Sequence, residues 1–420
     1  MKSLDKKLAE IHSYPNSNAF ILADAKDADM AFGIAAPGKS PEHAEGRFRS
    51  LAEYRDHIRR NVRQGLVDIM LMSVSSNEIL TIRERIFDGS DVTPAIRAND
   101  TTDIHVARGA SYPQVPARPF RTALLDHAQC GQTNCDISDR CLGANLGLFS
   151  MTFNNDVNLD REMLEAYKAF RIEAEQRGFR HFLEVFTPNA MVNPIPPEKL
   201  GGFLNDMIAR TLAGVPSSAR PLFLKIPYTG PAAMEELAKY DPHLVPGILG
   251  GSAGTTYDAF KLLSEAKKYG ARAALFGRKI NNAEHQLSFI QFLRWIADGE
   301  IQPEEATKAY HGVLAGLGIR PHRSLEEDMQ LTGGITSYGS SSRTISIPNS
   351  PDSTFATAAA SPSSVRVKKP SDEHSDFAGN ASRDVNISWP TRPDGLPDFA
   401  KMTPKQRLAY HQTRLSDTIE

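Results

Sequence analysis

The feature that most constrains the fold of this 420-residue chain is a regular alternation of short apolar runs with helical patterns between residue 19 and about residue 300. Between the apolar runs lie amphipathic helical patterns such as 50–66, 160–179 and 255–271. Near-continuous apolar runs of this length are typical of parallel strands buried on both faces. The eight runs are 19–25, 67–73, 92–98, 146–153, 181–186, 221–228, 243–250 and 271–277.

Eight strands that alternate with helices over roughly 250–300 residues indicate a (β/α)8 TIM barrel. A doubly wound open sheet is the alternative, and it normally carries a glycine-rich turn after its first strand. Here that turn reads DAKDADMAFG (24–33), which is not glycine-rich. The third βα unit is irregular, since 111–145 lacks a clean amphipathic helix and contains all three cysteines. We therefore predict a barrel with a cysteine-containing insertion in this unit.

Composition divides the chain into four parts. Residues 1–18 predict an N-terminal capping helix, and 19–333 form the barrel. Residues 334–402 are rich in Ser, Pro, Thr and Ala, and such a segment is expected to be a disordered linker because it has too little apolar surface to offset its ordering entropy. Residues 403–420 begin with Thr-Pro, a helix-start signal, and predict a C-terminal helix, which either docks on a partner or forms only transiently.

The charge balance argues against two classes of partner. The net charge of −2, from 48 basic and 50 acidic residues, gives no footprint for nucleic acid or for an anionic membrane. The N-terminus reads as a charged amphipathic helix and not as a signal peptide. Three cysteines suggest no disulfide framework, so we expect a reducing, cytoplasmic compartment. We also expect a homo-oligomer, and the tail leaves room for a further partner.

Lys225 lies inside the apolar run 221-PLFLKIPYTG-230, where its charge must be neutralised or desolvated. In a barrel, chemistry takes place at the carboxyl ends of the strands. A desolvated lysine amine beside carboxylates can attack a ketone or aldehyde and form a Schiff base. Asp24 at the end of the first strand and Glu184 in the fifth are the candidate proton carriers. The structural alternative is that Lys225 only pairs with a carboxylate or extends its amine to water.

Two turns suggest a site for an anion. Gly250, Gly251 and Ser252 follow the seventh strand, and Gly277 and Arg278 follow the eighth. Barrels often bind a substrate phosphate between these two loops, because glycine lets backbone N–H groups approach the oxyanion and arginine adds a bidentate donor. Further candidate substrate-binding residues at strand ends are Lys26, Asp27 and Tyr228.

The motifs LFLKIPYTG, VPGILGGSAGT and ALFGRKIN resemble those of the archaeal-type class I fructose-bisphosphate aldolases and, more loosely, of the tagatose-bisphosphate aldolases. The resemblance covers roughly residues 19–295. It implies a Schiff-base lyase without a cofactor, acting on a sugar or sugar phosphate. It places the imine-forming lysine at Lys225, the phosphate loops at Gly250, Gly251, Gly277 and Arg278, and the strand-five glutamate of the tagatose type at Glu184. The strand-one aspartate falls on Asp24, or alternatively on Asp27.

Two positions differ from these families. Phe186 stands where the archaeal-type enzymes have a tyrosine proton donor, and the strand-four run LGLFSMTF contains no lysine. A Schiff-base barrel of another reaction type, such as acyl transfer or cleavage of a non-phosphorylated substrate, therefore stays open. A catalytically inactive scaffold is the alternative from another class.

The remaining local signal is a cluster of His127, Cys130, Cys135 and Cys141. Thiolates and imidazole are good ligands for a tetrahedral structural zinc. The spacing lacks the CxxC knuckle of common zinc sites, so three reduced thiols are the favoured interpretation and the zinc site is the alternative.

Overall fold

The structure is a computed structural model that describes residues 1–40, 47–191, 193–251 and 254–332, together with 390–391, 401–403 and 406. The chain separates into two compact units, Met1–Pro351 and Asp352–Glu420. The predicted linker 334–402 and helix 403–420 lie, apart from these last few positions, outside the described residues. At Thr403 the backbone N–H and the hydroxyl both donate to Gln406 Oε1 at 3.0 Å, which is a capping arrangement at the expected helix start.

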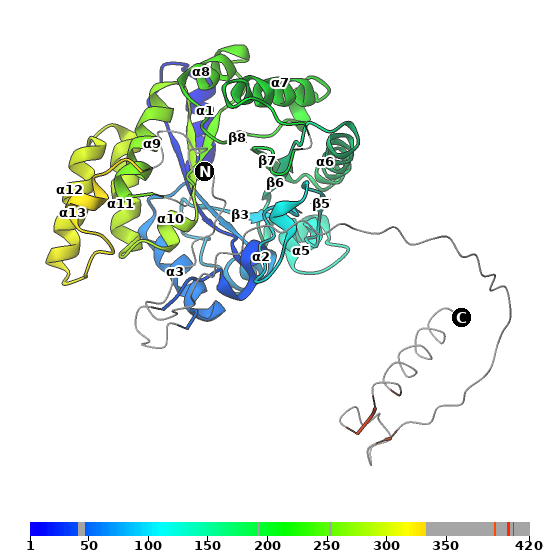
Figure 1. Cartoon of the computed structure of the whole chain (residues 1–420). Coiled ribbons are helices and arrows are strands. Elements are labelled where there is room, and N and C mark those ends of the chain that lie inside the picture. Colours follow the sequence, from blue (N-terminus) through cyan, green and yellow to red (C-terminus); the bar gives the residue numbers. More distant parts are fainter. Residues whose placement is uncertain are drawn as a thin grey trace, which may run out of the picture. The chain divides into compact units, whose positions relative to one another are not determined.

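Eight parallel strands form the predicted barrel, which Figure 1 shows as a ring surrounded by helices. Their order around the ring is β8-β7-β6-β3-β2-β1-β10-β9. The ring closes between β8 and β9, where Ile226 pairs with Ile248 and its N–H donates to Gly247 O at 2.9 Å. The strands are β1 (Ile21–Lys26), β2 (Ile69–Met72), β3 (Thr93–Arg97), β6 (Leu146–Thr152), β7 (Arg180–Phe186), β8 (Leu224–Lys225), β9 (Gly247–Leu249) and β10 (Ala273–Phe276).

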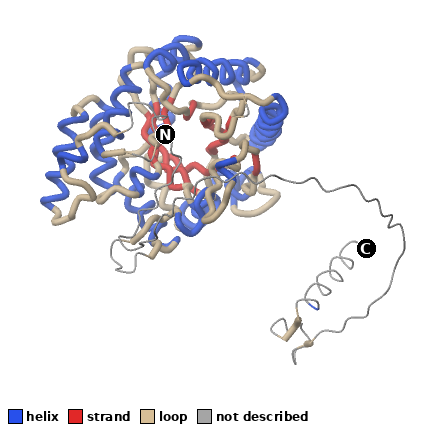
Figure 2. The backbone as a smooth tube through the Cα atoms, viewed as in Figure 1, coloured by secondary structure: helices blue, strands red, loops and turns tan. Residues whose placement is uncertain are grey.

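Helices cover the outside of this ring, as Figure 2 shows in blue. Several begin at capping side chains that satisfy free N–H groups of the first turn, for example Ser50 before α3 and Thr255 before α9. None of the described helices has the length and apolar character needed to cross a membrane. The helices are α1 (Ser3–Ser13), α2 (Asp29–Phe32), α3 (Leu51–Gln64), α4 (Val74–Asn77), α5 (Leu125–Cys130), α6 (Val157–Arg177), α7 (Leu200–Ala213), α8 (Pro231–Tyr240), α9 (Thr256–Lys268), α10 (Arg278–Asn281), α11 (Gln286–Asp298), α12 (Pro303–Gly316) and α13 (Leu325–Asp328).

The strands separate two apolar layers because their side chains alternate between faces. One cluster lies inside the ring and contains residues such as Ala23, Leu71 and Leu275. The larger cluster lies between strands and helices and contains residues such as Leu22 and Met70. Leu4, Leu8 and Ile11 of α1 belong to the inner cluster, so α1 covers the amino end of the barrel and leaves the carboxyl ends of the strands for a site.

The third βα unit is irregular, as predicted. A short antiparallel ribbon of β4 (Asp100–Thr101) and β5 (Pro119–Phe120) follows β3, and the six-residue helix α5 stands where a full barrel helix would be expected. The N–H of Val106 donates to Ala31 O of α2 at 2.9 Å, so this insertion reaches back to the loop after β1. The insertion thus contributes polar residues to the carboxyl end of the barrel.

Candidate active site

Four charged side chains form a chain of ion pairs across the carboxyl ends of the strands. Lys225 Nζ lies 2.6 Å from Glu184 Oε1, and Arg97 Nη2 lies 3.6 Å from Glu184 Oε2. Arg97 Nε donates to Asp27 Oδ2 at 2.5 Å. Ser150 on β6 bridges the gap, since its hydroxyl accepts from Arg97 Nη1 at 2.9 Å and donates to Glu184 Oε2 at 2.7 Å. This series of ion pairs therefore connects β3, β6, β7 and β8 with Asp27, the residue that follows β1.

The alternation of the strands places all of these side chains inside the ring. Residues two positions apart on a strand face the same side. The inner cluster contains the residues two positions before Asp27, Arg97, Ser150, Glu184 and Lys225, namely Ala25, Ala95, Leu148, Phe182 and Phe223. A buried strand that carries a charge at its carboxyl end thus delivers that charge to the mouth of the barrel.

The charge of Lys225 is neutralised by a carboxylate, which explains how a lysine can occupy a buried strand. The side chain is 8% exposed, and that of Glu184 is 1% exposed. Such a pair is stable only when its geometry is good and the remaining polar atoms have partners. Ser150 and Arg97 provide those partners for Glu184. The pair agrees with the structural alternative, in which Lys225 only pairs with a carboxylate. It also puts a proton acceptor in direct contact with an amine that could act as a nucleophile.

Asp24 and Lys26 do not join this cluster, contrary to the prediction that they face the mouth. Both are fully buried on the helix side of β1, with Lys26 Nζ 3.1 Å from Asp24 Oδ1. Asn61 of α3 donates to Asp24 Oδ2 at 2.7 Å. Burial raises the pKa of the Asp24 carboxyl and lowers the pKa of the Lys26 amine. Asp27, the alternative that the sequence left open, is the strand-one carboxylate inside the ring.

Tyr228 is also on the helix side. It belongs to the cluster between strands and helices, together with Leu224 and Ile226 of the same segment. Burial raises the pKa of its hydroxyl, and the nearby Glu265 of α9 adds to this shift. Tyr228 lies three positions after Lys225, and an odd spacing along an extended chain puts two side chains on opposite faces. The prediction that Tyr228 binds substrate at the mouth is therefore wrong.

The glycines predicted to bind an anion have steric reasons to be glycine. A Cβ atom at Gly250 would lie 2.1 Å from the Phe276 ring, and one at Gly277 would lie 2.9 Å from the carbonyl oxygen of Ala25. Gly251 has a φ of +62°, a conformation that L side chains rarely adopt. Ser252 lies outside the described residues. The two turns thus pack their backbone against β10 and β1, and the N–H of Gly250 donates to Leu275 O at 2.8 Å.

Arg278 begins α10 at the carboxyl end of β10. Its guanidinium lies over the ring of Phe32, 5.6 Å from the ring centre. None of the ion pairs recorded among the described residues includes Arg278, and burial without a carboxylate lowers its pKa to about 10. The adjacent Lys279 is instead occupied, since its amine donates to the carbonyl oxygens of Gly254 and Thr255. A half-buried arginine without a carboxylate partner favours an anionic ligand.

The sequence reasoning assigned no role to Arg97, Ser150 or Asp100, which complete the cluster. Arg97 Nη1 lies 3.2 Å from Asp100 Oδ1. Burial raises the pKa of Asp100 to about 7, and the neighbouring carboxylates Asp27 and Glu184 add to this effect while Arg97 opposes it. The available signal was the same as for Lys225: a polar residue at the end of an apolar run.

The cysteines do not form the cluster considered from the sequence. Cys130 and Cys135 form a disulfide with a Cα–Cα separation of 6.0 Å, and Cys141 is a free, exposed thiol. The prediction of three reduced thiols is therefore wrong. The reason is local: α5 ends at Cys130, and Gly131, with a φ of +82°, turns the chain back on itself. Among the described residues, no group of three or more His, Cys, Asp or Glu side chains is arranged to hold a metal ion, so the zinc alternative finds no support there.

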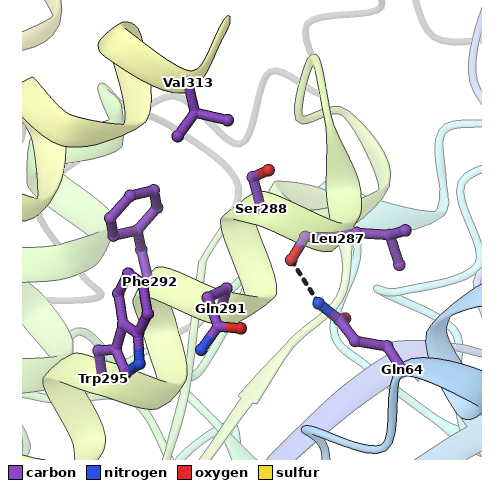
Figure 3. A pocket seen from close by; sticks show the side chains of 7 residues that line it. All are labelled: Gln64, Leu287, Ser288, Gln291, Phe292, Trp295 and Val313. Carbon is purple, nitrogen blue, oxygen red and sulfur yellow. Dashed lines mark hydrogen bonds between the residues drawn. The ribbon is translucent and has the colours of Figure 1, made fainter. Parts of the chain in front are cut away.

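A shallow groove of about 180 Å³ lies elsewhere, in the helix layer (Figure 3). It is lined by residues of α3, α11 and α12, and Gln64 Nε2 donates across it to Leu287 O at 2.8 Å. None of the charged residues at the strand ends lines this groove, so we do not assign the chemistry to it.

Comparison with solved structures agrees with the barrel. The chain matches the fructose-bisphosphate aldolase from Slackia heliotrinireducens with a TM-score of 0.52 and 11% identity, over 74% of this chain and 90% of that one. It matches an archaeal fructose 1,6-bisphosphate aldolase with a TM-score of 0.49 and 16% identity, over 70% of this chain and 99% of that one. No protein-family model and no curated protein sequence matches the chain. At these identities the likeness shows the fold, and any function must be argued from the site.

Proposed function

We propose that this protein is a Schiff-base lyase of the class I aldolase type, which cleaves or forms the bond between the α and β carbons of the carbonyl group of a ketose or aldehyde. The observation that carries the proposal is the contact of 2.6 Å between Lys225 Nζ and Glu184 Oε1 at the carboxyl end of a barrel strand. A buried amine with a proton acceptor in direct contact is the arrangement that imine formation needs. The similar fold of the fructose-bisphosphate aldolase from Slackia heliotrinireducens adds support by analogy.

The chain's own residues can be given roles in this reaction. The unprotonated amine of Lys225 attacks the substrate carbonyl, and Glu184 moves the proton that converts the carbinolamine hydroxyl into leaving water. The protonated imine then takes up the electron pair of the breaking carbon–carbon bond. A carboxylate accepts the proton of the hydroxyl on the departing carbon, and we assign this step to Asp27, which accepts a hydrogen bond from Arg97. Protonation of the resulting enamine and hydrolysis of the imine restore the lysine.

The polar turns at β9 and β10 supply the binding end of the site. Gly250, Gly251 and Gly277 place no side chains in these turns, and Arg278 provides a cation without a carboxylate partner among the described residues. We assign a phosphate or another anionic group of the substrate to this end, which we call the Arg278 end. No cofactor is required, because the electron sink is the imine itself.

Trapping with borohydride tests the proposal directly. The full chain is incubated with a panel of keto and aldehyde sugars and sugar phosphates, reduced, digested and analysed by mass spectrometry. We expect a stable adduct on Lys225 and no adduct in Lys225→Met, which keeps an unbranched side chain of similar length. Lys279→Met is the matched control, because that amine is buried but bonded to backbone carbonyls. An adduct that persists in Lys225→Met, or no adduct with any ligand, contradicts the proposal.

A further inference from the structure

The side of the mouth formed by β3 and β6 is lined by hydrogen-bond acceptors. Asp100 and Asp103 both lie in the segment after β3, and both are buried. The hydroxyl of Thr152 on β6 donates to Asp103, at 3.2 Å to Oδ2. Beyond Thr152, the side-chain amide of Asn154 is 1% exposed and donates to Ala117 O at 3.5 Å. We call this group of four residues the acceptor side.

Asn154 gives the clearest sign that the acceptor side faces a ligand. Its Oδ1 atom is buried and has no hydrogen-bond partner among the described residues. Asn154 continues the alternation of Ser150 and Thr152 on the inner face of β6. A buried carbonyl oxygen without a donor costs free energy, so a donor from a ligand would stabilise it. A hydroxyl group can donate to this atom, whereas a phosphate dianion has no proton to donate.

The cations nearby are already occupied. Arg97 faces Asp27, Asp100 and Glu184, and Lys225 faces Glu184. Among the described residues, these three carboxylates outnumber the two cations that contact them. The raised pKa of Asp100 has the same cause, since its desolvated carboxyl lies among other carboxylates. A second phosphate placed here would meet like charge, and the two neighbouring cations of the described residues already contact carboxylates.

The Arg278 end lies across the ring from the acceptor side. In the closed order of strands, β10 and β6 are separated by three strands in either direction. A substrate that reaches from Arg278 over Lys225 to Asn154 therefore spans the mouth, with its two ends in opposite electrostatic surroundings.

We propose that the substrate is anionic at one end only: a polyhydroxylated ketose with a single phosphate, whose phosphate binds at Arg278 and whose uncharged, hydroxyl-bearing end donates hydrogen bonds to the acceptor side. This inference rests on the proposed function, because it names the substrate class of the same site. It differs from the bisphosphate substrate for which the structurally similar aldolases are named.

The test compares three ligands that share one carbon skeleton: fructose 1-phosphate, fructose 6-phosphate and fructose 1,6-bisphosphate. Borohydride trapping at Lys225 is followed by mass spectrometry as a function of ligand concentration. We expect one monophosphate to half-saturate the trapping at a concentration at least about tenfold below that of the bisphosphate, since like charge in a buried site is strongly unfavourable. A bisphosphate trapped equally well or better overturns the inference while the proposed function stands. If none of the three ligands modifies Lys225 but another sugar does, the substrate class is wrong.

Two variants test which residues discriminate between the monophosphate and the bisphosphate. Above the Asp100 pKa of about 7, Asp100→Asn removes one negative charge, so at pH 8 it should improve bisphosphate trapping relative to the monophosphate. Asn154→Leu should weaken monophosphate trapping about fivefold to tenfold, the effect of one hydrogen bond. Asp91→Asn is the control, because this exposed carboxylate lies at the amino end of β3 beside Lys6. The electrostatic assignment is contradicted if the ratio of the half-saturating concentrations of bisphosphate and monophosphate is unchanged in Asp100→Asn. It is also contradicted if this ratio changes as much in Asp91→Asn.

Discussion

Replacing Glu184 by Gln tests whether the contact with Lys225 contributes to stability as well as to chemistry. The change keeps the shape of the side chain but leaves Lys225 buried without its carboxylate partner. Removing one member of a buried ion pair typically costs about 3–5 kcal/mol. We expect about 3 kcal/mol, the lower end of the range, because the glutamine carbonyl can still accept a hydrogen bond from Lys225 or Ser150.

The partner variant should behave differently. Lys225→Met leaves Glu184 in contact with Ser150 at 2.7 Å and with Arg97 at 3.6 Å, so its carboxylate remains compensated. We expect Lys225→Met to cost about 1 kcal/mol or less, because it also removes the desolvation of an amine. In the double variant neither charge is left unpaired, so the two costs should not add, and the coupling energy should be about 2 kcal/mol.

Urea unfolding followed by circular dichroism measures these quantities for the wild type, both single variants and the double variant. The matched control is the surface pair Lys168–Glu165, which has an N–O distance of 2.7 Å but side chains more than half exposed. Exposed pairs contribute about 0–1 kcal/mol, so the cycle on this pair should give a small coupling. A coupling for Glu184 and Lys225 no larger than that of the surface pair would refute the view that burial gives this contact its energy.

Three further expectations concern single residues. Arg278→Ala should weaken binding of a phosphorylated ligand by about ten- to a hundredfold, as expected when a charge-assisted contact is lost. Arg83→Ala on the exposed surface should leave the affinity unchanged. Titration calorimetry with a phosphorylated ligand measures the affinity of both variants. The folded-state pKa of Asp100, about 7, exceeds its ordinary value near 3.9, so the folded state binds the proton more tightly and the contribution of Asp100 to stability falls as pH rises from about 4 to 7. Asp100→Asn should therefore raise the urea midpoint more at pH 8 than at pH 4. An equal effect at both pH values contradicts the raised pKa. Alkylation of the denatured, unreduced protein should label only Cys141, and labelling of all three cysteines means that the disulfide does not form.

The sequence was sufficient for the barrel because each strand is an apolar run, and Lys225, the proposed nucleophile, stands out as a charge within such a run. It was not sufficient for the face on which each polar residue lies. In β1 every residue is buried, so hydrophobicity does not show whether Ile21 or Leu22 points into the ring. Asp24 and Asp27 are three positions apart and cannot both face inward, yet nothing in the run itself selects one of them.

The sequence pattern does contain part of the information on which face each polar residue lies. Once Lys225 is assumed to face the ring, alternation excludes Tyr228 without any structure. Arg97 and Ser150 could have been found by applying the argument for Lys225 to every strand. The partners of Arg97 could not have been found from the sequence, because they come from the loop after β1, the insertion after β3 and the strand β7. Whether these segments contact one another depends on the order of strands around the ring.

The packing of α1 against the inner cluster has a consequence for turnover. With Leu4, Leu8 and Ile11 packed on the inner cluster at the amino end, a ligand can approach the barrel only at the carboxyl ends of its strands. Under the proposed function, one fragment stays bonded to Lys225 until water hydrolyses the imine, while the other is free as soon as the carbon–carbon bond breaks. The proposal therefore implies that both fragments leave at the same end of the barrel, the unbonded one first and the bonded one last.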